Sequence, residues 1–115
     1  MSSESLVEGP GGVLGAWEND GQVFFASVDR AAPPVVAPGA PSGRKHPVVM
    51  QNAAGETLVA WTEGTGWQRG GALAWQLYDK AGKPTGEKGR LDGGIPPWGL
   101  PTAVARPDGG FTLIH

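Results

Sequence analysis

Short apolar runs, separated by turns rich in glycine, proline and asparagine, make up most of the chain. Runs of about four to eight residues with β-branched and aromatic side chains are typical of β-strands. No stretch keeps the apolar period of an amphipathic helix, so the pattern predicts an all-β protein with essentially no helix. The polar residues 1–11 are expected to be a frayed start with at most a short strand near residues 5–7. The other expected strands cover residues 13–18, 22–28, 33–37, 47–51, 56–62, 72–78, 86–91, 102–105 and 111–114.

One of these expected strands, residues 56–62, carries apolar side chains on both of its faces. Leu58 and Ala60 share one face, and Val59 and Trp61 share the other. A sheet that is apolar on both faces has to be covered on both sides. In an antiparallel protein the cover is the next sheet, as in the stacked blades of a β-propeller. The alternative is a β-sandwich, although its strands would carry a polar outer face.

The run from Leu58 to Glu63 has weaker counterparts elsewhere in the chain. Leu14-Gly-Ala-Trp-Glu18 matches it earlier, and aligning residue 112 with residue 57 gives a later copy. The preceding segments also match, because Pro47-Val-Val-Met50 corresponds to Pro101-Thr-Ala-Val104. A unit that recurs about every 40–55 residues is typical of a chain of repeated sheets.

The repeat predicts antiparallel four-stranded meander blades, about two and a half of them, within one partial propeller domain. Residues 12–45 are expected to form an incomplete blade, residues 46–99 a complete blade and residues 100–115 half a blade. A closed propeller needs about four to eight blades. The chain is therefore expected to be a fragment that the rest of a parent propeller completes. Alternatively, several copies associate through their open strand edges.

Composition favours a packed β protein and argues against several classes of function. The 20 Gly and 11 Pro fall between apolar runs, where turns need them, and 39% hydrophobic residues suit a core. A net charge of −2 without a basic stripe argues against a nucleic-acid partner. Zero cysteines exclude disulfides and thiol chemistry. No apolar run approaches the roughly 20 residues of a membrane span, and residues 1–5 lack a signal-peptide pattern.

The candidate ligand-binding residues fall in loops that a meander places at one end of its sheets. Strands alternate in direction, so loops from second to third and from fourth to first strands emerge on the same side. An indole packs on the apolar face of a sugar, while guanidinium and carboxylate groups bind its polar substituents. The pattern therefore predicts a glycan platform. The candidate residues in these loops and their flanks are Trp67, Arg69, Trp98, Glu63, Arg44 and His46.

These residues also have structural interpretations. Trp67 and Trp98 can fill gaps between blades, and Arg44 can form a solvated loop pair with Lys45. His46, just before a proline, can be structural. No cofactor or metal is expected, since His115 has no second ligand at suitable spacing. The tryptophans expected in the core are Trp17, Trp61 and Trp75.

The segments after the expected third strands carry a degenerate motif. Ser27-Val-Asp29-Arg-Ala31 and Asp79-Lys-Ala-Gly82 resemble the Ser-x-Asp-x-Gly-x-Thr-Trp pattern of sialidase-like, Asp-box bacterial β-propellers. The resemblance covers residues 12–115 and implies the carboxy-terminal portion of an exported protein of this group, whose signal peptide lies outside this chain. Asp29 and Asp79 are expected to accept backbone N–H groups in their turns.

The catalytic residues of sialidases do not carry over to this chain. Sialidases resemble one another in an arginine triad, a Tyr–Glu nucleophile pair and an Asp acid/base. Arg44 lies three residues before Pro47 instead of two, and Tyr78 lies at the end away from the expected ligand face. The catalytic residues are thus unknown, and the expected function is a non-catalytic propeller segment that binds glycans. The alternatives are a glycoside hydrolase fragment that uses Glu63, and a purely structural repeat segment.

Overall fold

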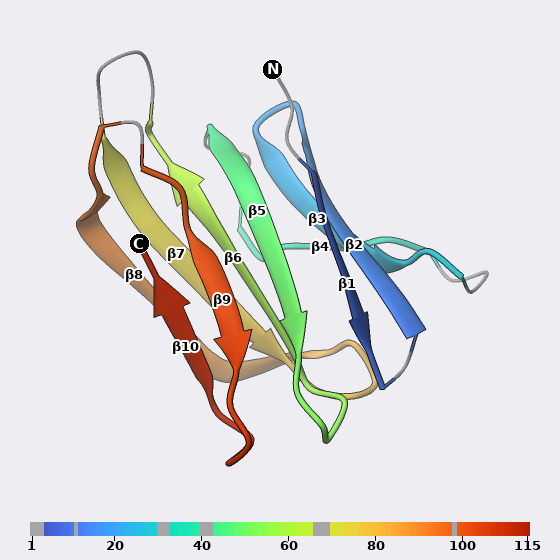
Figure 1. The fold of residues 1–115 in the computed structure, drawn as a ribbon. Helices are drawn as coiled ribbons and strands as arrows, with labels where there is room; N and C mark the ends of the chain where they lie inside the picture. The colour runs from blue at the N-terminus through green and yellow to red at the C-terminus, as the bar shows by residue number, and fades with distance from the viewer. Residues whose placement is uncertain (1–3, 11, 30–32, 40–42, 66–69, 98) are drawn as a thin grey trace.

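A computed structural model describes residues 4–10, 12–29, 33–39, 43–65, 70–97 and 99–115 of the chain. Within these residues every regular element is a strand, and all strand pairs are antiparallel (Figure 1). The all-β prediction is therefore confirmed. The strands are β1 (Glu4–Gly9), β2 (Gly12–Asn19), β3 (Gln22–Ser27), β4 (Val35–Val36), β5 (Arg44–Gln51), β6 (Thr57–Glu63), β7 (Gly71–Tyr78), β8 (Pro84–Ile95), β9 (Thr102–Ala105) and β10 (Phe111–Ile114).

The strands form three meanders in chain order. The first sheet has the order β1-β2-β3-β4, the second β5-β6-β7-β8, and the third consists of β9 and β10. The β2–β3 hairpin turns at Asp20 and Gly21, which both have positive φ angles of 51° and 75°. Two such residues are what a tight hairpin turn needs, and an Asp-Gly pair adopts these angles readily.

The first sheet is more complete than the sequence indicated. The expected frayed start contains β1, which pairs with β2 along its whole length and gives this sheet a fourth strand. Val7 packs against the buried core, but its neighbours Leu6 and Glu8 point away from it and are exposed. A strand with only one inward apolar residue has little apolar pattern, which explains why the sequence predicted at most a short strand here.

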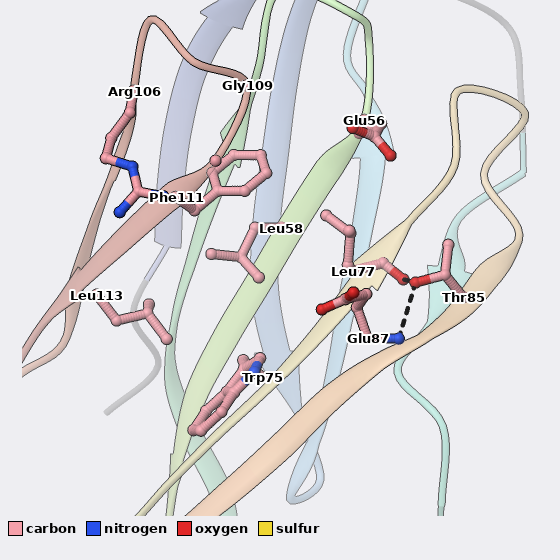
Figure 2. Close-up of a pocket in the computed structure, with 11 residues that line it drawn as sticks. Glu56, Leu58, Trp75, Leu77, Thr85, Glu87, Arg106, Gly109, Phe111 and Leu113 are labelled. Carbon is pink, nitrogen blue, oxygen red and sulfur yellow. Dashed lines mark hydrogen bonds between the residues drawn. The ribbon is translucent and has the colours of Figure 1, made fainter.

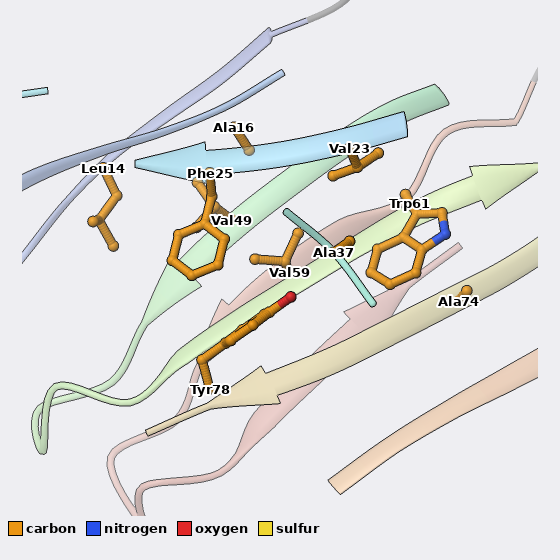
Figure 3. Close-up of a cluster of buried hydrophobic side chains, with 10 residues drawn as sticks. All are labelled: Leu14, Ala16, Val23, Phe25, Ala37, Val49, Val59, Trp61, Ala74 and Tyr78. Carbon is orange, nitrogen blue, oxygen red and sulfur yellow. The ribbon is translucent and has the colours of Figure 1, made fainter. Parts of the chain in front are cut away.

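The first and second sheets pack face to face through the larger core of the molecule (Figure 3). Phe25 of β3 meets Tyr78 of β7 with ring centroids 4.6 Å apart, in a tilted arrangement that aromatic pairs favour. The predicted core position of Trp61 is confirmed, because it is buried in this cluster. The cluster consists of Leu14, Ala16, Val23, Phe25, Ala37, Val49, Val59, Trp61, Ala74 and Tyr78.

The opposite face of the second sheet packs against the third sheet. Ala60, Leu73 and Ile95 form a second buried cluster, and Leu113 of β10 packs against it together with Trp75. Every residue of β6 is buried as a result. The prediction that this strand is covered on both faces is therefore confirmed, and the described residues form a stack of three sheets.

The turns of the second and third sheets show how the repeat aligns. The Asn52 N–H donates to the Glu56 carbonyl over 3.0 Å, and the Arg106 N–H donates to the Gly110 carbonyl over 2.8 Å. This equivalence aligns residue 112 with residue 58, so the alignment with residue 57 made from the sequence is wrong by one position. A slip of one residue turns every side chain of a strand to the other face. Leu113 is thus the counterpart of Val59.

Apolar side chains remain exposed on both outward faces of the stack. On the first sheet, Leu6 is 71% exposed, and Trp17 stacks on Phe24 at a centroid distance of 5.9 Å. Trp17 is therefore half-buried on an outward face, and its predicted place in the core is wrong. On the third sheet, Val104 and Ile114 are exposed. Within the described part of the chain, no other sheet covers these two faces.

Candidate functional site

The strand ends that flank the two predicted ligand loops lie together. Glu63 at the end of β6 pairs with Ala72 near the start of β7, and Gly71 pairs with Ile95 at the end of β8. The loops that follow β6 and β8 therefore begin at the same end of the second sheet (Figure 1). Three predicted site residues, Trp67, Arg69 and Trp98, lie outside the described residues.

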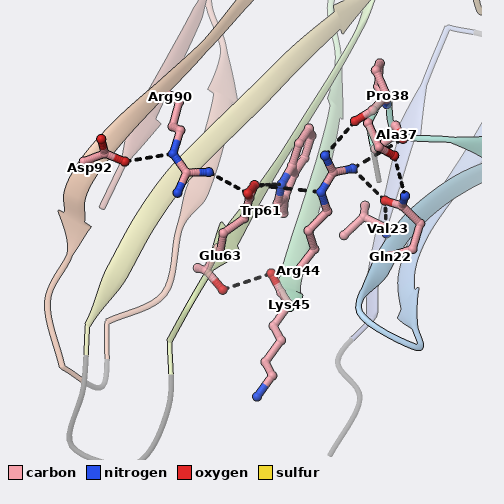
Figure 4. Close-up of polar contacts among 12 residues, drawn as sticks. Gln22, Val23, Ala37, Pro38, Arg44, Lys45, Trp61, Glu63, Arg90 and Asp92 are labelled. Atoms are coloured by element: carbon pink, nitrogen blue, oxygen red, sulfur yellow. Dashed lines mark hydrogen bonds and ion pairs between the residues drawn. The ribbon is translucent and has the colours of Figure 1, made fainter. Parts of the chain in front are cut away.

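Arg44 is a buried strand residue, which corrects its predicted place in a loop. It begins β5 and is only 7% exposed. Its guanidinium donates to Gln22 Oε1 over 2.6 Å and to the carbonyls of Pro38 and Ala37 over 2.6 and 3.3 Å (Figure 4). It also lies 4.9 Å from the centroid of the Trp61 ring. The planar guanidinium offers five donors and a face for stacking, so one side chain joins β5 to the first sheet.

Glu63 lies beside Arg44 and is 9% exposed. Its Oε1 accepts a 2.6 Å bond from Arg90 of β8, and its Oε2 accepts a 3.2 Å bond from the Trp61 indole. Arg44 Nε is 3.8 Å from the same Oε2 and has no hydrogen-bond partner among the described residues. Arg90 also donates to Asp92 over 2.8 Å, and these two carboxylates raise the pKa of Arg90. The carboxylate of Glu63 therefore lies between two guanidinium groups at the end of the second sheet.

This arrangement holds Glu63 in place and does not suit it for glycoside hydrolysis. A glycosidase uses two carboxyl groups about 5–10 Å apart that flank the scissile bond. Both oxygens of Glu63 already accept hydrogen bonds, and the nearby Asp92 is bound to the same guanidinium of Arg90. No group of three potential metal ligands occurs among the described residues.

A groove of ≈ 500 Å³ runs beside this network, on the face of the second sheet that meets the first sheet. It remains open because β4 has only two residues and leaves the outer strands of the second sheet uncovered. Cationic groups outnumber carboxylates in its lining, which favours a negatively charged ligand. The lining residues are Pro38, Gly39, Arg44, Trp61, Glu63, Ala74, Trp75, Gln76, Lys88, Gly89 and Arg90.

His46 lies in an irregular part of β5. Its φ angle is 52°, and the pairing with β6 shifts register between Lys45 and Val48. The backbone there forms a bulge, which turns the half-buried imidazole away from the regular alternation of the strand. Partial burial, and then the charge of Lys45, lower the pKa of His46. The lowered pKa favours the neutral form of the imidazole near neutral pH.

The aspartates of the degenerate motif bind backbone groups. Asp79 Oδ1 accepts the N–H groups of Ala81 and Lys83, as predicted for a turn. Asp29 instead accepts the N–H of Val13 on the neighbouring strand, and its other oxygen accepts the Ser27 hydroxyl. Both side chains therefore accept hydrogen bonds from groups at or beside strand ends.

A second groove, of ≈ 620 Å³, was not predicted. It lies between the second sheet and β10, with Trp75 and Leu77 on one side and Phe111 and Leu113 on the other (Figure 2). The sequence contains one indication of this groove, namely the prediction that residues 100–115 form only half a blade. Two strands cannot cover all four strands of the second sheet, so its outer strands β7 and β8 remain partly uncovered. The other residues that line it are Glu56, Leu58, Thr85, Glu87, Arg106, Gly109 and Gly110.

Comparison of the chain with protein-family models, with curated proteins and with solved structures gave no match. None of the described residues belong to a helix that could span a membrane.

Proposed function

We propose that this chain is a non-catalytic segment of a sialidase-like β-propeller from an exported protein, and that its loop end binds acidic glycans. The propeller architecture is supported by the second sheet, which is a four-stranded meander buried on both faces by neighbouring sheets. Propeller blades have this strand order and this two-sided cover. The first strands also suit the proposal, because β5 lies between β1 and β9, as inner strands of successive blades do.

The glycan proposal is supported by the end of the second sheet. The loops after β6 and β8 start from strand ends at the same end of the sheet, and the Arg90–Glu63 ion pair joins β8 to β6 there. Binding sites generally use loops that a rigid scaffold positions. The adjacent groove of ≈ 500 Å³ is within the size range of small-ligand sites. Its excess of cationic groups favours sugars that carry a carboxylate.

Glycan-array binding followed by calorimetry tests this proposal. The wild-type chain is expected to bind carboxylated glycans, and the Trp67→Ala/Trp98→Ala double variant is expected to lose the sugar platform. Lys88→Ala removes an exposed cation that lines the groove, and Lys83→Ala removes a comparable cation at the far end of β7 and β8. We expect Lys88→Ala to weaken binding about 3- to 10-fold, and Lys83→Ala to leave it unchanged.

Each outcome of this experiment has a clear meaning. If the wild-type chain does not bind glycans, the glycan-binding hypothesis is ruled out and a purely structural repeat segment remains. If the wild type and the double tryptophan variant bind equally well, Trp67 and Trp98 do not form the sugar-binding platform. Equal effects of Lys88→Ala and Lys83→Ala would show that the cationic groove does not contribute to binding.

A further inference from the structure

Gln76 of β7 is a buried side chain with one polar atom that lacks a partner. It is 2% exposed, and its Nε2 donates to the carbonyls of Leu77 and Thr85 over 2.8 Å each. Both partners are acceptors, so they fix which end of the amide faces them. The Oε1 atom accepts no hydrogen bond among the described residues. A buried acceptor is costly to leave without a donor, so this oxygen requires one from water or from a ligand.

Gln76 lines the ≈ 500 Å³ groove together with Lys88 of β8. The two residues lie directly opposite each other in the pairing of β7 with β8. Opposed residues of an antiparallel pair carry their side chains on the same face, with Cβ atoms about 4.5–5.5 Å apart. Lys88 is exposed and forms no ion pair with any other described residue. An unpaired ammonium group therefore lies beside an unpaired acceptor oxygen.

The other charged side chains of the groove lining already have partners. Both oxygens of Glu63 accept hydrogen bonds, one of them from Arg90 (Figure 4). Arg44 donates to three acceptors on the side of the first sheet, and its Nε is fully buried. Within the described part of the lining, Lys88 and Gln76 are thus the two side chains best placed to bind a ligand.

We propose that this groove binds one sugar-acid residue, with the carboxylate on Lys88 and a hydroxyl group donating to Gln76 Oε1. The inference rests on the proposed function, and it assigns the acidic sugar to a sheet face as well as to the loops. A sugar acid carries both groups on one ring, whereas a simple carboxylate lacks the donor that Gln76 requires. A site built to bind a hydroxyl group discriminates against an analogue without it.

Titrations followed by NMR on isotope-labelled protein test this site with three ring compounds. D-glucuronate carries a carboxylate and hydroxyl groups, D-glucose has only the hydroxyl groups, and cyclohexanecarboxylate has only the carboxylate. We expect D-glucuronate to shift the side-chain amide signal of Gln76 saturably. Each of the other two compounds should bind at least about threefold more weakly, because it loses one contact. The amide of Gln51, which binds Gly55 and Thr57 near the β5–β6 turn, is the internal reference and should not shift.

Protein variants separate the two contacts when the backbone signals of β7 and β8 are followed. Gln76→Met removes the acceptor and keeps an unbranched side chain. We expect it to weaken D-glucuronate binding at least about threefold and to leave cyclohexanecarboxylate binding unchanged. Lys88→Ala should weaken the binding of both carboxylates and leave that of D-glucose unchanged. Lys83→Ala, at the far end of the same strand pair, should change none of the three.

The proposal is overturned if D-glucuronate gives no saturable shift at Gln76. It is also overturned if D-glucose or cyclohexanecarboxylate binds the wild type as tightly as D-glucuronate. These comparisons use the unaltered protein, so they stay valid even if Gln76→Met lowers its stability.

The outcomes also distinguish this site from the proposed glycan function. Glycan-array binding by the wild type without a response of Gln76 to D-glucuronate would overturn the groove site and leave the loop platform. A response of Gln76 without array binding would support the groove site and overturn the glycan function of the loops.

Discussion

At the residue scale, buried polar side chains join the strands at one end of the molecule. Arg44 connects β5 to carbonyl groups of residues 37 and 38, and Glu63 receives hydrogen bonds from Trp61 and Arg90. Removal of one member of such a set leaves the others buried without a partner, which costs more than an average hydrogen bond contributes. Substitution of these residues is therefore expected to lower the stability of the protein.

Glu63→Gln is expected to lower the free energy of unfolding by about 1–3 kcal/mol, since a neutral amide cannot balance Arg44 and Arg90. Urea denaturation measures this change. Glu87→Gln is the control, because Glu87 is exposed on β8 and its loss should change stability by less than about 0.5 kcal/mol. Equal effects of the two substitutions would contradict the structural role of Glu63.

The single tyrosine provides a second test at this scale. Tyr78 is fully buried, its hydroxyl has no hydrogen-bond partner among the described residues, and burial raises its pKa to about 12. The unfolded chain loses this proton near its ordinary pKa of about 10. Stability from this group is thus complete below about pH 10 and is lost as the pH rises toward 12.

Tyr78→Phe is expected to remove this alkaline loss and to leave stability at neutral pH unchanged or higher by up to about 1 kcal/mol. Absorbance titration of the tyrosinate band gives the pKa, and urea denaturation at several pH values gives the stability. A normal tyrosine pKa in the folded protein would contradict the burial of this side chain.

The sequence predicts the positions of some of these residues in the fold but not of others, and the difference has a physical cause. The sequence predicts a core position for Trp61 because this residue lies in an apolar strand. For Arg44 the sequence predicts only a solvated loop, because its partners, the carbonyls of residues 37 and 38, reach it only when the first two sheets pack. Contacts that depend on tertiary packing leave no local pattern.

At the element scale, β8 shows how a single residue fixes the packing of two strands. Gly89 pairs with Trp75 across β7 and β8, and the indole lies where a side chain at position 89 would begin. The strand thus needs a residue without a Cβ atom at this position. Gly86 in the same strand has open space around it.

Gly89→Ala is therefore expected to lower the free energy of unfolding by about 1–3 kcal/mol, because the new methyl group displaces the Trp75 ring. Gly86→Ala should be neutral or stabilising by up to about 1 kcal/mol, since it only restricts the unfolded chain. Thermal and urea denaturation of both variants measure the difference. Similar stabilities for the two variants would contradict the close contact between Gly89 and Trp75.

The elements themselves were largely predictable, but their ends and register were not. The strands of the second sheet are predictable because their apolar runs are separated by turn sequences. The sequence does not predict the start of β5 at Arg44 or the end of β8 at Ile95, because pairing with neighbouring strands extends both strands into polar sequence. The sequence does not define the register of β10, since Leu113 and Ile114 are both apolar, and only the structure shows that Leu113 faces the core.

At the scale of the whole molecule, each end of the stack exposes an apolar sheet face. Leu6 lies on the outer face of the first sheet and Ile114 on the outer face of the third. Such faces are typical of interaction surfaces. Under the proposed function, further sheets of a propeller would cover them.

In isolation, the chain is expected to self-associate in a concentration-dependent way. The Leu6→Lys/Ile114→Lys variant should shift the molecules toward monomers, because it places a charge on both outward faces. Light scattering with size-exclusion chromatography measures the distribution. A wild-type chain that stays monomeric at high concentration would contradict the attraction between these faces.

The central claim is that the second sheet is buried between two others. Proton–proton contacts measured by NMR test it directly, because they report proximity on each face of β6 and β7. We predict contacts of Tyr78 with Phe25 on one face, and of Leu113 with Leu73 or Ile95 on the other. Contacts on one face only, with the other open to solvent, would contradict the stacked arrangement.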